Sequence, residues 1–362
     1  MIRQLIGHSA AYTFANLLAR GTVLVWLIVL PHFLSAADYG ALGLVTTIAA
    51  IVNVVVPLEI SQALARYYPG APEAERRSWA SSAWSFTLLA LAGAAALAFV
   101  FSERLNRLLF GSDRYLTVFQ LSIAYFAVNT SFVFTQNQFR WAFRPRGYTL
   151  VTAIFAVVTL VLSVGLAAVF ADALEGVLIG LVIGAAVGVI AGVAGLRNAL
   201  GLGIDRARLV RMLRFSLPLV PASISILLST YASRFILNGM LTLKEVGVYT
   251  WASQLGSIPA LLLLGVQGAI TPLVMKHHAE PGTPAILARS FETIVAAELC
   301  LCLAIALFTP ELISLLGYGS FASAASLVLI LAPANLLLQL YVFAPGFAVA
   351  QRTDLQLAVS IV

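Results

Sequence analysis

The sequence predicts an all-α integral membrane protein, and three observations support that fold class. Hydrophobic residues make up 61% of the chain and charged residues only 10%, whereas soluble domains carry about 25% charged residues. Apolar runs of about 20 residues, the length of a helix that crosses a bilayer core of about 30 Å, recur along the whole chain. Because these runs do not alternate apolar and polar residues, they lack the pattern of an outer-membrane barrel.

Ten of the apolar runs are long enough to be complete membrane spans. In chain order they are residues 10–34, 40–64, 79–101, 115–139, 148–170, 173–196, 215–238, 246–274, 288–309 and 321–343. An eleventh apolar run begins at Leu355 and stops at Val362, which is too short to cross a bilayer. We therefore expect the second half of the predicted fold to be truncated.

The basic residues lie mostly in every second loop. If the spans alternate in direction, one side of the membrane receives most of the arginines, and the other receives only Arg104, Arg107, Arg114 and Lys244. The positive-inside rule places the arginine-rich loops, and with them the N-terminus, in the cytoplasm. The net charge of +6 is thus spread over short loops, which argues against nucleic-acid binding.

An internal repeat relates the two halves of the chain. Residues 34–40 (LSAADYG) follow the first span, and residues 241–247 (LTLKEVG) follow the seventh, with hydroxyl, acid and glycine in the same order and an offset of 207 residues. An even number of spans separates the copies, so both enter the membrane in the same sense and form a parallel repeat. We expect two six-helix lobes, residues 1–200 and residues 201–362, the second holding four complete helices and the start of a fifth.

Two arginines fall inside expected spans, where an arginine costs roughly 2.5 to 3.5 kcal/mol on insertion scales. Arg20 is near the middle of the first span, and Arg234 lies toward the outer end of the seventh. Each continues a stripe of polar residues at helical spacing, and we expect such stripes to line a cavity. For any single amide, interhelical hydrogen bonding is the alternative interpretation. The other candidate substrate-binding residues are Tyr12, Asn16, Asn53, Asn129 and Gln136.

Acidic residues inside spans are candidates for coupling to protons or sodium ions. Glu298 is the best placed, since Glu59 and Glu292 lie near the ends of their spans and are expected to be solvated at the interface. The chain contains no phosphate-cradling glycine loop, metal-spaced cluster or nucleophile elbow. We therefore expect no catalytic residue, no metal, no cofactor and no enzymatic activity.

Several short motifs are shared with a known family. They are residues 30–35 (LPHFLS), 38–40 (DYG), 63–68 (ALARYY), 213–221 (LRFSLPLVP), 245–249 (EVGVY) and 271–272 (TP). On these motifs the sequence resembles the Wzx-type polysaccharide flippases of the multidrug/oligosaccharidyl-lipid/polysaccharide exporter (MOP) superfamily, which also contains the MATE transporters.

The resemblance implies two six-helix lobes around a central cavity, and export of undecaprenyl-diphosphate-linked oligosaccharide to the outer leaflet of the bacterial cytoplasmic membrane by alternating access. It implies that cationic cavity residues bind the anionic substrate, a role that falls on Arg20 and, by position, on Arg234. Arginine suits this role because its planar fork matches phosphate oxygens. The implied partners are the lipid-linked oligosaccharide, membrane lipids and other polysaccharide-assembly proteins.

Other function classes stay open at this point. A cation-coupled exporter of small amphiphiles would be expected to carry deep acids instead of deep arginines, and only Glu298 fits that pattern. A membrane glycosyltransferase or polysaccharide polymerase would be expected to carry a substantial external loop, whereas the predicted external loops are short. A structural subunit of a glycan-export complex is the third alternative.

Overall fold

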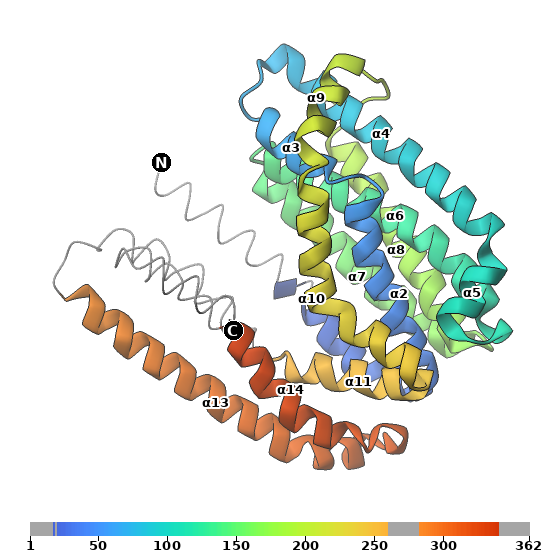
Figure 1. The fold of residues 1–362 in the computed structure, drawn as a ribbon, viewed down its shortest axis with the longest axis vertical. Coiled ribbons are helices and arrows are strands. Elements are labelled where there is room, and N and C mark those ends of the chain that lie inside the picture. Colours follow the sequence, from blue (N-terminus) through green and yellow to red (C-terminus); the bar gives the residue numbers. More distant parts are fainter. Residues whose placement is uncertain (1–16, 19, 260–281, 340–362) are drawn as a thin grey trace. The chain divides into compact units, whose positions relative to one another are not determined.

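The computed structural model describes residues 17–18, 20–259 and 282–339 (Figure 1). Within these ranges the regular secondary structure is helical throughout. Seven of the described helices are long and apolar enough to cross a membrane, which confirms the predicted fold class. The chain divides into two compact units, Met1–Gly247 and Val248–Val362. The division into lobes at residues 200 and 201 stays a prediction.

The first unit contains most of the described helices. A helix over Arg20–His32 leads into α2, and its last turn is the 3-10 helix η1 (Leu30–His32). The helices that follow are α2 (Ala36–Val55), α3 (Ile60–Tyr67), α4 (Glu73–Val100), α5 (Ser102–Phe110), η2 (Asp113–Tyr115), α6 (Leu116–Trp141), α7 (Pro145–Val169), α8 (Ala173–Gly195), α9 (Arg206–Ser216) and α10 (Leu219–Met240). Helix α11 (Leu243–Gly256) begins at the end of this unit.

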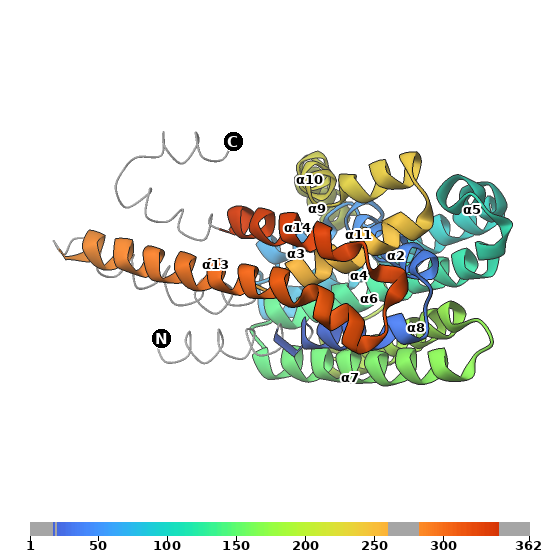
Figure 2. The same cartoon turned by 90° about the horizontal axis from the view of Figure 1, so that it is seen from below.

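Helices α7 and α8 lie side by side in both views (Figures 1 and 2). The close approach depends on small residues, because an added Cβ at Gly180 would meet the backbone of Ser163 on α7. Packing through small residues is how membrane helices approach closely without a hydrophobic driving force between them. The glycines of this series recur every four residues along α8, at Gly176, Gly180, Gly184, Gly188 and Gly192.

The predicted span 40–64 is interrupted in the structure. Helix α2 ends at Val55, and Leu58 and Glu59 adopt left-handed backbone angles, with φ of 52° and 54°, before α3 begins. Pro57 cannot donate a backbone hydrogen bond, which favours a break at this point. The expectation of one continuous helix to residue 64 was therefore wrong, and α3 is a separate short helix.

Two other short helices lie in segments between the predicted spans. Helix α5 follows α4 after one residue and ends at Gly111, whose φ is 65°. Helix α9 begins after Asp205, whose carboxylate accepts a hydrogen bond from the Arg208 N–H at 3.1 Å. Helix α9 contacts α3 and α4 at one end of the first unit (Figure 1). Helices α5 and α9 are short and polar, so hydropathy alone does not predict them.

The described part of the second unit consists of the end of α11, helix α13 (Thr283–Leu316), the 3-10 helix η3 (Gly319–Phe321) and helix α14 (Ala324–Gln339). Helices α13 and α14 contact one another, and Gly317, with φ of 73°, ends α13. Trp251 lies 5.8 Å from Phe321 between ring centroids. Helix α13 is longer than the predicted span 288–309, and the later parts of spans 246–274 and 321–343 lie outside the described residues.

Both copies of the sequence repeat begin a helix, and in each a hydroxyl residue bonds to the acid three positions later. The Ser35 hydroxyl accepts from the Asp38 N–H at 3.2 Å and donates to the Asp38 carboxylate at 2.6 Å. In the second copy the Thr242 N–H and hydroxyl donate to the Glu245 carboxylate at 2.8 and 2.9 Å. Each copy thus shows one of the two backbone contacts of a capping box, the Asp38 N–H being satisfied in the first and the Thr242 N–H in the second.

The glycines of the two repeat copies also meet. A Cβ added to Gly247 would overlap the backbone of Ala36 and lie 2.8 Å from the Gly40 nitrogen, while one added to Gly40 would lie 2.9 Å from the Gly247 nitrogen. The starts of α2 and α11 therefore cross at these two residues. The repeat seen in the sequence corresponds to a paired structural feature.

Candidate functional site

Helix α2 carries polar side chains that bond to helices on two sides. Helix α2 contacts both α6 and α10 in the first unit (Figure 1). The polar residues lie at Thr47, at Asn53 and just beyond the helix at Glu59. Each of the three is hydrogen-bonded to a different residue of a neighbouring helix. The candidate functional site is this polar face of α2 together with the residues that contact it.

Arg234 is held against α2 by neutral oxygens. Its Nη1 donates to the Thr47 hydroxyl at 2.7 Å and to the Gly43 carbonyl at 3.4 Å. The Thr47 hydroxyl in turn donates to the same Gly43 carbonyl at 2.8 Å, and Thr47 is fully buried. The Arg234 guanidinium also lies 5.6 Å from the centre of the Tyr231 ring. A predicted cavity arginine is thus half-buried, with a fixed position on the α2 and α10 surface.

Asn53 and Gln136 take part in interhelical hydrogen bonds. The Asn53 carbonyl oxygen accepts from the Thr130 hydroxyl of α6 at 2.5 Å. Gln136 donates its Nε2 to the Thr152 hydroxyl of α7 at 2.7 Å. Asn129, next to Thr130, is buried within α6. These contacts agree with the alternative interpretation in which the amides join helices, and their role in substrate binding stays a prediction.

Glu59 has a hydrogen-bond partner that could not be inferred from the sequence. Its carboxylate accepts from the Ser223 hydroxyl of α10 at 2.5 Å. Ser223 and Arg234 are 11 residues apart on α10, so at about 1.5 Å per residue they contact the α2 and α3 region at heights that differ by about 16 Å. Ser223 and Arg234 therefore lie on the part of α10 that faces the α2 and α3 region, whereas Thr230, between them on α10, is exposed.

Arg20 lies on the helix that precedes α2, and its side chain is exposed. It forms no hydrogen bond or ion pair with another described residue. Six positions after Arg20 on the same helix, the Trp26 indole donates to the Ser163 hydroxyl of α7 at 3.0 Å. This hydrogen bond fixes the later part of the helix. Tyr12 and Asn16, predicted to share a stripe with Arg20, lie outside the described residues.

Glu298 belongs to the second unit and is only 1% exposed. Neither of its carboxylate oxygens has a hydrogen-bond partner among the described residues. Cys302 lies one helical turn further along α13 and is also buried. A buried acid is expensive in a membrane helix and is a default candidate for function. Its predicted part in ion coupling stays a prediction.

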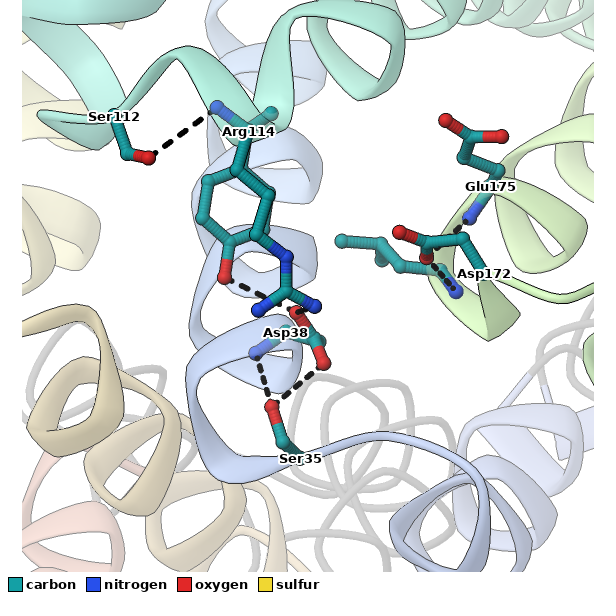
Figure 3. Close-up of polar contacts among 8 residues, drawn as sticks. Ser35, Asp38, Ser112, Arg114, Asp172 and Glu175 are labelled. Atoms are coloured by element: carbon teal, nitrogen blue, oxygen red, sulfur yellow. Dashed lines mark hydrogen bonds and ion pairs between the residues drawn. The ribbon is translucent and has the colours of Figure 1, made fainter.

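A second polar cluster fastens the end of the first unit opposite α3 and α9. In Figure 3 the Arg114 guanidinium lies on one side of the Asp38 carboxylate, at 3.3 Å, and Ser35 lies on the other. The Tyr115 hydroxyl also donates to this carboxylate, at 3.0 Å. The Asp172 carboxylate beside this cluster accepts from the backbone N–H of Glu175 at the start of α8. Asp38 is only 8% exposed. This cluster joins the start of α2 to η2 at the start of α6, which indicates a structural role.

The fold is shared with solved membrane transporters. The Vibrio cholerae MATE transporter VcmN in its bent form matches with a TM-score of 0.59 at 13% identity, over 95% of this chain and 84% of that one. An inward-facing multidrug resistance MATE family transporter matches with a TM-score of 0.56 at 18% identity, over 93% and 86%. A MOP superfamily transporter from Pyrococcus furiosus matches with a TM-score of 0.53 at 13% identity, over 96% and 89%. At these identities the similarity establishes the fold.

The described helices and the fold match those of solved multi-pass membrane transporters. The family model described as polysaccharide biosynthesis protein matches residues 7–278, about three quarters of the chain. The chain belongs to the polysaccharide biosynthesis protein family. This confirms the family predicted from the short motifs. A comparison with curated protein sequences gives no match.

Proposed function

We propose that this protein is a flippase that carries undecaprenyl-diphosphate-linked oligosaccharide across the bacterial cytoplasmic membrane by alternating access. Family membership supports a role in polysaccharide biosynthesis, and the fold supports transport. The N-terminus is proposed to lie in the cytoplasm, on the side of the arginine-rich loops. The polar head of the substrate would cross beside the protein's polar residues, while the polyprenyl tail stays in lipid.

The observation that carries the proposal is Arg234, half-buried on a candidate membrane span and held by neutral oxygens of α2. A guanidinium in such a place costs free energy, so a functional reason for keeping it is expected. Fixed by Thr47 and Gly43, the side chain has little conformational freedom left to lose when it binds an anion. Of the groups on the proposed substrate, the diphosphate would form the strongest, charge-assisted hydrogen bonds to arginine.

Arg20 is proposed as the second contact of the diphosphate. It is exposed on the helix that leads into α2, in the same unit as Arg234. Two arginines could bind the two phosphate groups separately, or could bind them in turn as the head group crosses. The proposed transport breaks or forms no covalent bond, and we therefore propose no enzymatic activity.

The test follows transfer of a labelled diphosphate-linked oligosaccharide lipid between the leaflets of proteoliposomes. Arg20→Ala and Arg234→Ala are expected to lose about tenfold or more of the initial rate, because hydrogen bonds to charged groups contribute about 1.5 to 3 kcal/mol. Arg197→Ala is the control, since Arg197 is an exposed arginine after the end of α8. Wild-type transfer rates in both arginine variants would contradict the proposed role of these arginines in substrate binding. If folded wild-type protein transferred no lipid under several ion gradients, the flippase proposal itself would be contradicted.

Glu298 favours a second candidate function, a cation-coupled exporter of small amphiphiles. It is a buried acid without a hydrogen-bond partner among the described residues, and such acids relay protons in transporters. Efflux of a cationic dye driven by a proton gradient, abolished in Glu298→Gln, would support the exporter. If the dye is not moved by wild-type protein that does move the lipid-linked oligosaccharide, this candidate is excluded.

A further inference from the structure

A pocket of about 840 Å³ lies in the first unit, at the end formed by α3 and α9. Its volume is in the range of pockets that bind small molecules. It lies apart from the Arg234 contact with α2, and neither the flippase proposal nor the family description assigns it a role. Its charged and aromatic lining residues are Arg66, Tyr67, Arg206, Arg211, Arg214 and Phe215.

The spacing of α9 explains why its arginines reach one pocket. Arg206, Val210 and Arg214 follow one another at intervals of four residues, as do Ala207, Arg211 and Phe215 on the adjacent stripe. Residues four apart share a helix face. Met212 and Ser216 are buried on the other side of the helix, toward the bundle. The sequence therefore forms an amphipathic helix whose outward face is basic.

Aromatic rings hold two of the guanidinium groups at the pocket. Arg66 lies 4.6 Å from the centre of the Phe215 ring, and Arg211 lies 5.0 Å from the centre of the Tyr67 ring. Tyr67 itself stacks on Trp79 of α4, with centroids 5.1 Å apart. A cation over an aromatic face keeps its N–H groups available at its edges. The rings thus orient two arginines and leave their charge without neutralisation.

The charges of the pocket are unbalanced among the described residues. No acid lines the pocket, and Arg66, Arg206, Arg211 and Arg214 form no ion pair with a described residue. Arg208 on the same helix differs, because it pairs with Glu75 at 2.9 Å and with Asp205 at 3.6 Å. Four like charges around one pocket repel one another and create a positive potential that an anion would relieve.

Apolar side chains beside the pocket indicate a membrane surface. Val210, which lines the pocket, and Leu217, just after α9, are 41% and 48% exposed. The pocket opens at the end of the unit where the candidate spans α2, α6 and α8 finish and α4 and α7 start. That end carries the arginine-rich loops. An amphipathic basic helix with exposed apolar residues is suited to the bilayer interface.

We propose that this pocket binds the phosphate-bearing head group of an anionic phospholipid of the surrounding bilayer. The arginines would contact the phosphate oxygens in pairs, and the exposed apolar side chains would contact the first methylene groups of the acyl chains. A lipid with two phosphates, such as cardiolipin, would match four arginines best. The site is independent of transport, so it stands or falls separately from the flippase.

The test measures binding of cardiolipin, phosphatidylglycerol and phosphatidylcholine to the purified protein in neutral detergent, by the lipid-dependent shift in thermal unfolding. The variant Arg66→Gln/Arg211→Gln/Arg214→Gln is expected to bind cardiolipin more than about tenfold more weakly, since each basic residue beside the anionic head group contributes about fivefold to its affinity. The control Arg144→Gln/Arg146→Gln/Arg197→Gln removes equal charge from exposed arginines outside the pocket and should change affinity less than about twofold.

Arg214→Gln alone keeps the test decisive if the triple variant does not fold. Arg214 forms no hydrogen bond, ion pair or ring contact with a described residue, so its loss should leave stability unchanged and weaken cardiolipin binding about fivefold. If cardiolipin affinity fell equally in the two triple variants, general surface charge would explain the binding, and this outcome would overturn the proposal. So would binding of phosphatidylcholine as strong as that of cardiolipin, or full competition by inorganic pyrophosphate at equal concentration, which would indicate a site for free anions.

Discussion

At the scale of single residues, the charged side chains inside the first unit are placed by partners far away in the sequence. Arg234 contacts Thr47 across 187 positions, and Ser223 contacts Glu59 across 164. The sequence identifies Arg234 as expensive because its own position in a span is enough for that inference. Thr47 could not be identified in the same way, since a buried threonine in an apolar helix is ordinary until its partner is known.

The Thr47 contact makes a prediction about Arg234. Thr47→Val keeps the shape of the side chain and removes the hydroxyl that accepts from the Arg234 guanidinium at 2.7 Å. The free energy of unfolding should fall by about 1.5 to 3 kcal/mol, the contribution of a hydrogen bond to a charged group. In Arg234→Met the same Thr47→Val change should matter much less. A double-mutant cycle measured by denaturant titration in detergent checks this, and equal effects in both backgrounds would show that the two residues are not coupled.

Asp38 allows a matched comparison between a buried and an exposed carboxylate. Asp38→Asn weakens the contacts to Arg114 and Tyr115, and we expect a loss of about 1 to 3 kcal/mol because Asp38 is buried. Asp113→Asn breaks the Arg107 ion pair, whose side chains are 63% and 75% exposed, and should cost less than about 1 kcal/mol. Thermal unfolding of the two variants would contradict this ranking if Asp113→Asn were the more damaging.

The cap at the second repeat predicts a dependence on pH. The backbone N–H of Thr242, and then its hydroxyl, lower the pKa of Glu245 below the ordinary value of 4.5. A carboxyl whose pKa is lower in the folded state stabilises that state above its unfolded pKa, and the contribution is lost as the pH falls through the folded pKa. The stability difference between wild type and Glu245→Gln should therefore be constant well above pH 4.5 and be lost progressively as the pH falls below that value, through the lower pKa of the folded state. A difference that persisted at lower pH would show that the cap acts without its charge.

At the scale of elements, the long apolar helices were predictable and the short polar ones were not. Continuous apolar runs specify α4, α6, α7 and α8 because lipid requires about 20 apolar residues per span. Helix α9 has too many arginines for that criterion, but its spacing of four residues was a signal that a search for amphipathic helices would have found. The break after α2 includes left-handed backbone angles at Leu58 and Glu59. Such angles cannot be predicted from these residue types, which rarely adopt them.

The packing of α8 predicts unequal effects of two similar substitutions. Gly180→Ala would place a methyl group against the backbone of Ser163, so we expect a loss of about 1 to 3 kcal/mol from overpacking. Gly93→Ala in α4 meets nothing within 4 Å and should be neutral or slightly stabilising, since alanine is the better helix former. Unfolding of both variants in detergent is the measurement. A tolerated alanine at position 180 would mean that α7 and α8 can separate at little cost.

At the scale of the whole molecule, the sequence predicted the fold class and the family correctly, through hydropathy and a handful of motifs. The repeat was visible because its two copies are short capping sequences of the same type, and the structure adds that their glycines touch. The candidate site could only be predicted in part. Deep arginines stand out in any span, whereas amide side chains bind either substrate or another helix, and only the three-dimensional neighbours of Asn53 and Gln136 distinguish the two.

The contact between Gly40 and Gly247 also has a consequence for biosynthesis. The two glycines are 207 residues apart, so at about 5 to 20 residues per second a ribosome needs roughly 10 to 40 s to deliver the second after the first. During that interval the side of the α2 starting turn that meets Gly247 would have no partner. Helix α10, the least apolar of the seven candidate spans, emerges at the end of the interval. Thr47 would then already be in the membrane as a hydrogen-bond acceptor for Arg234. The order of synthesis would therefore favour insertion of this weakly apolar helix.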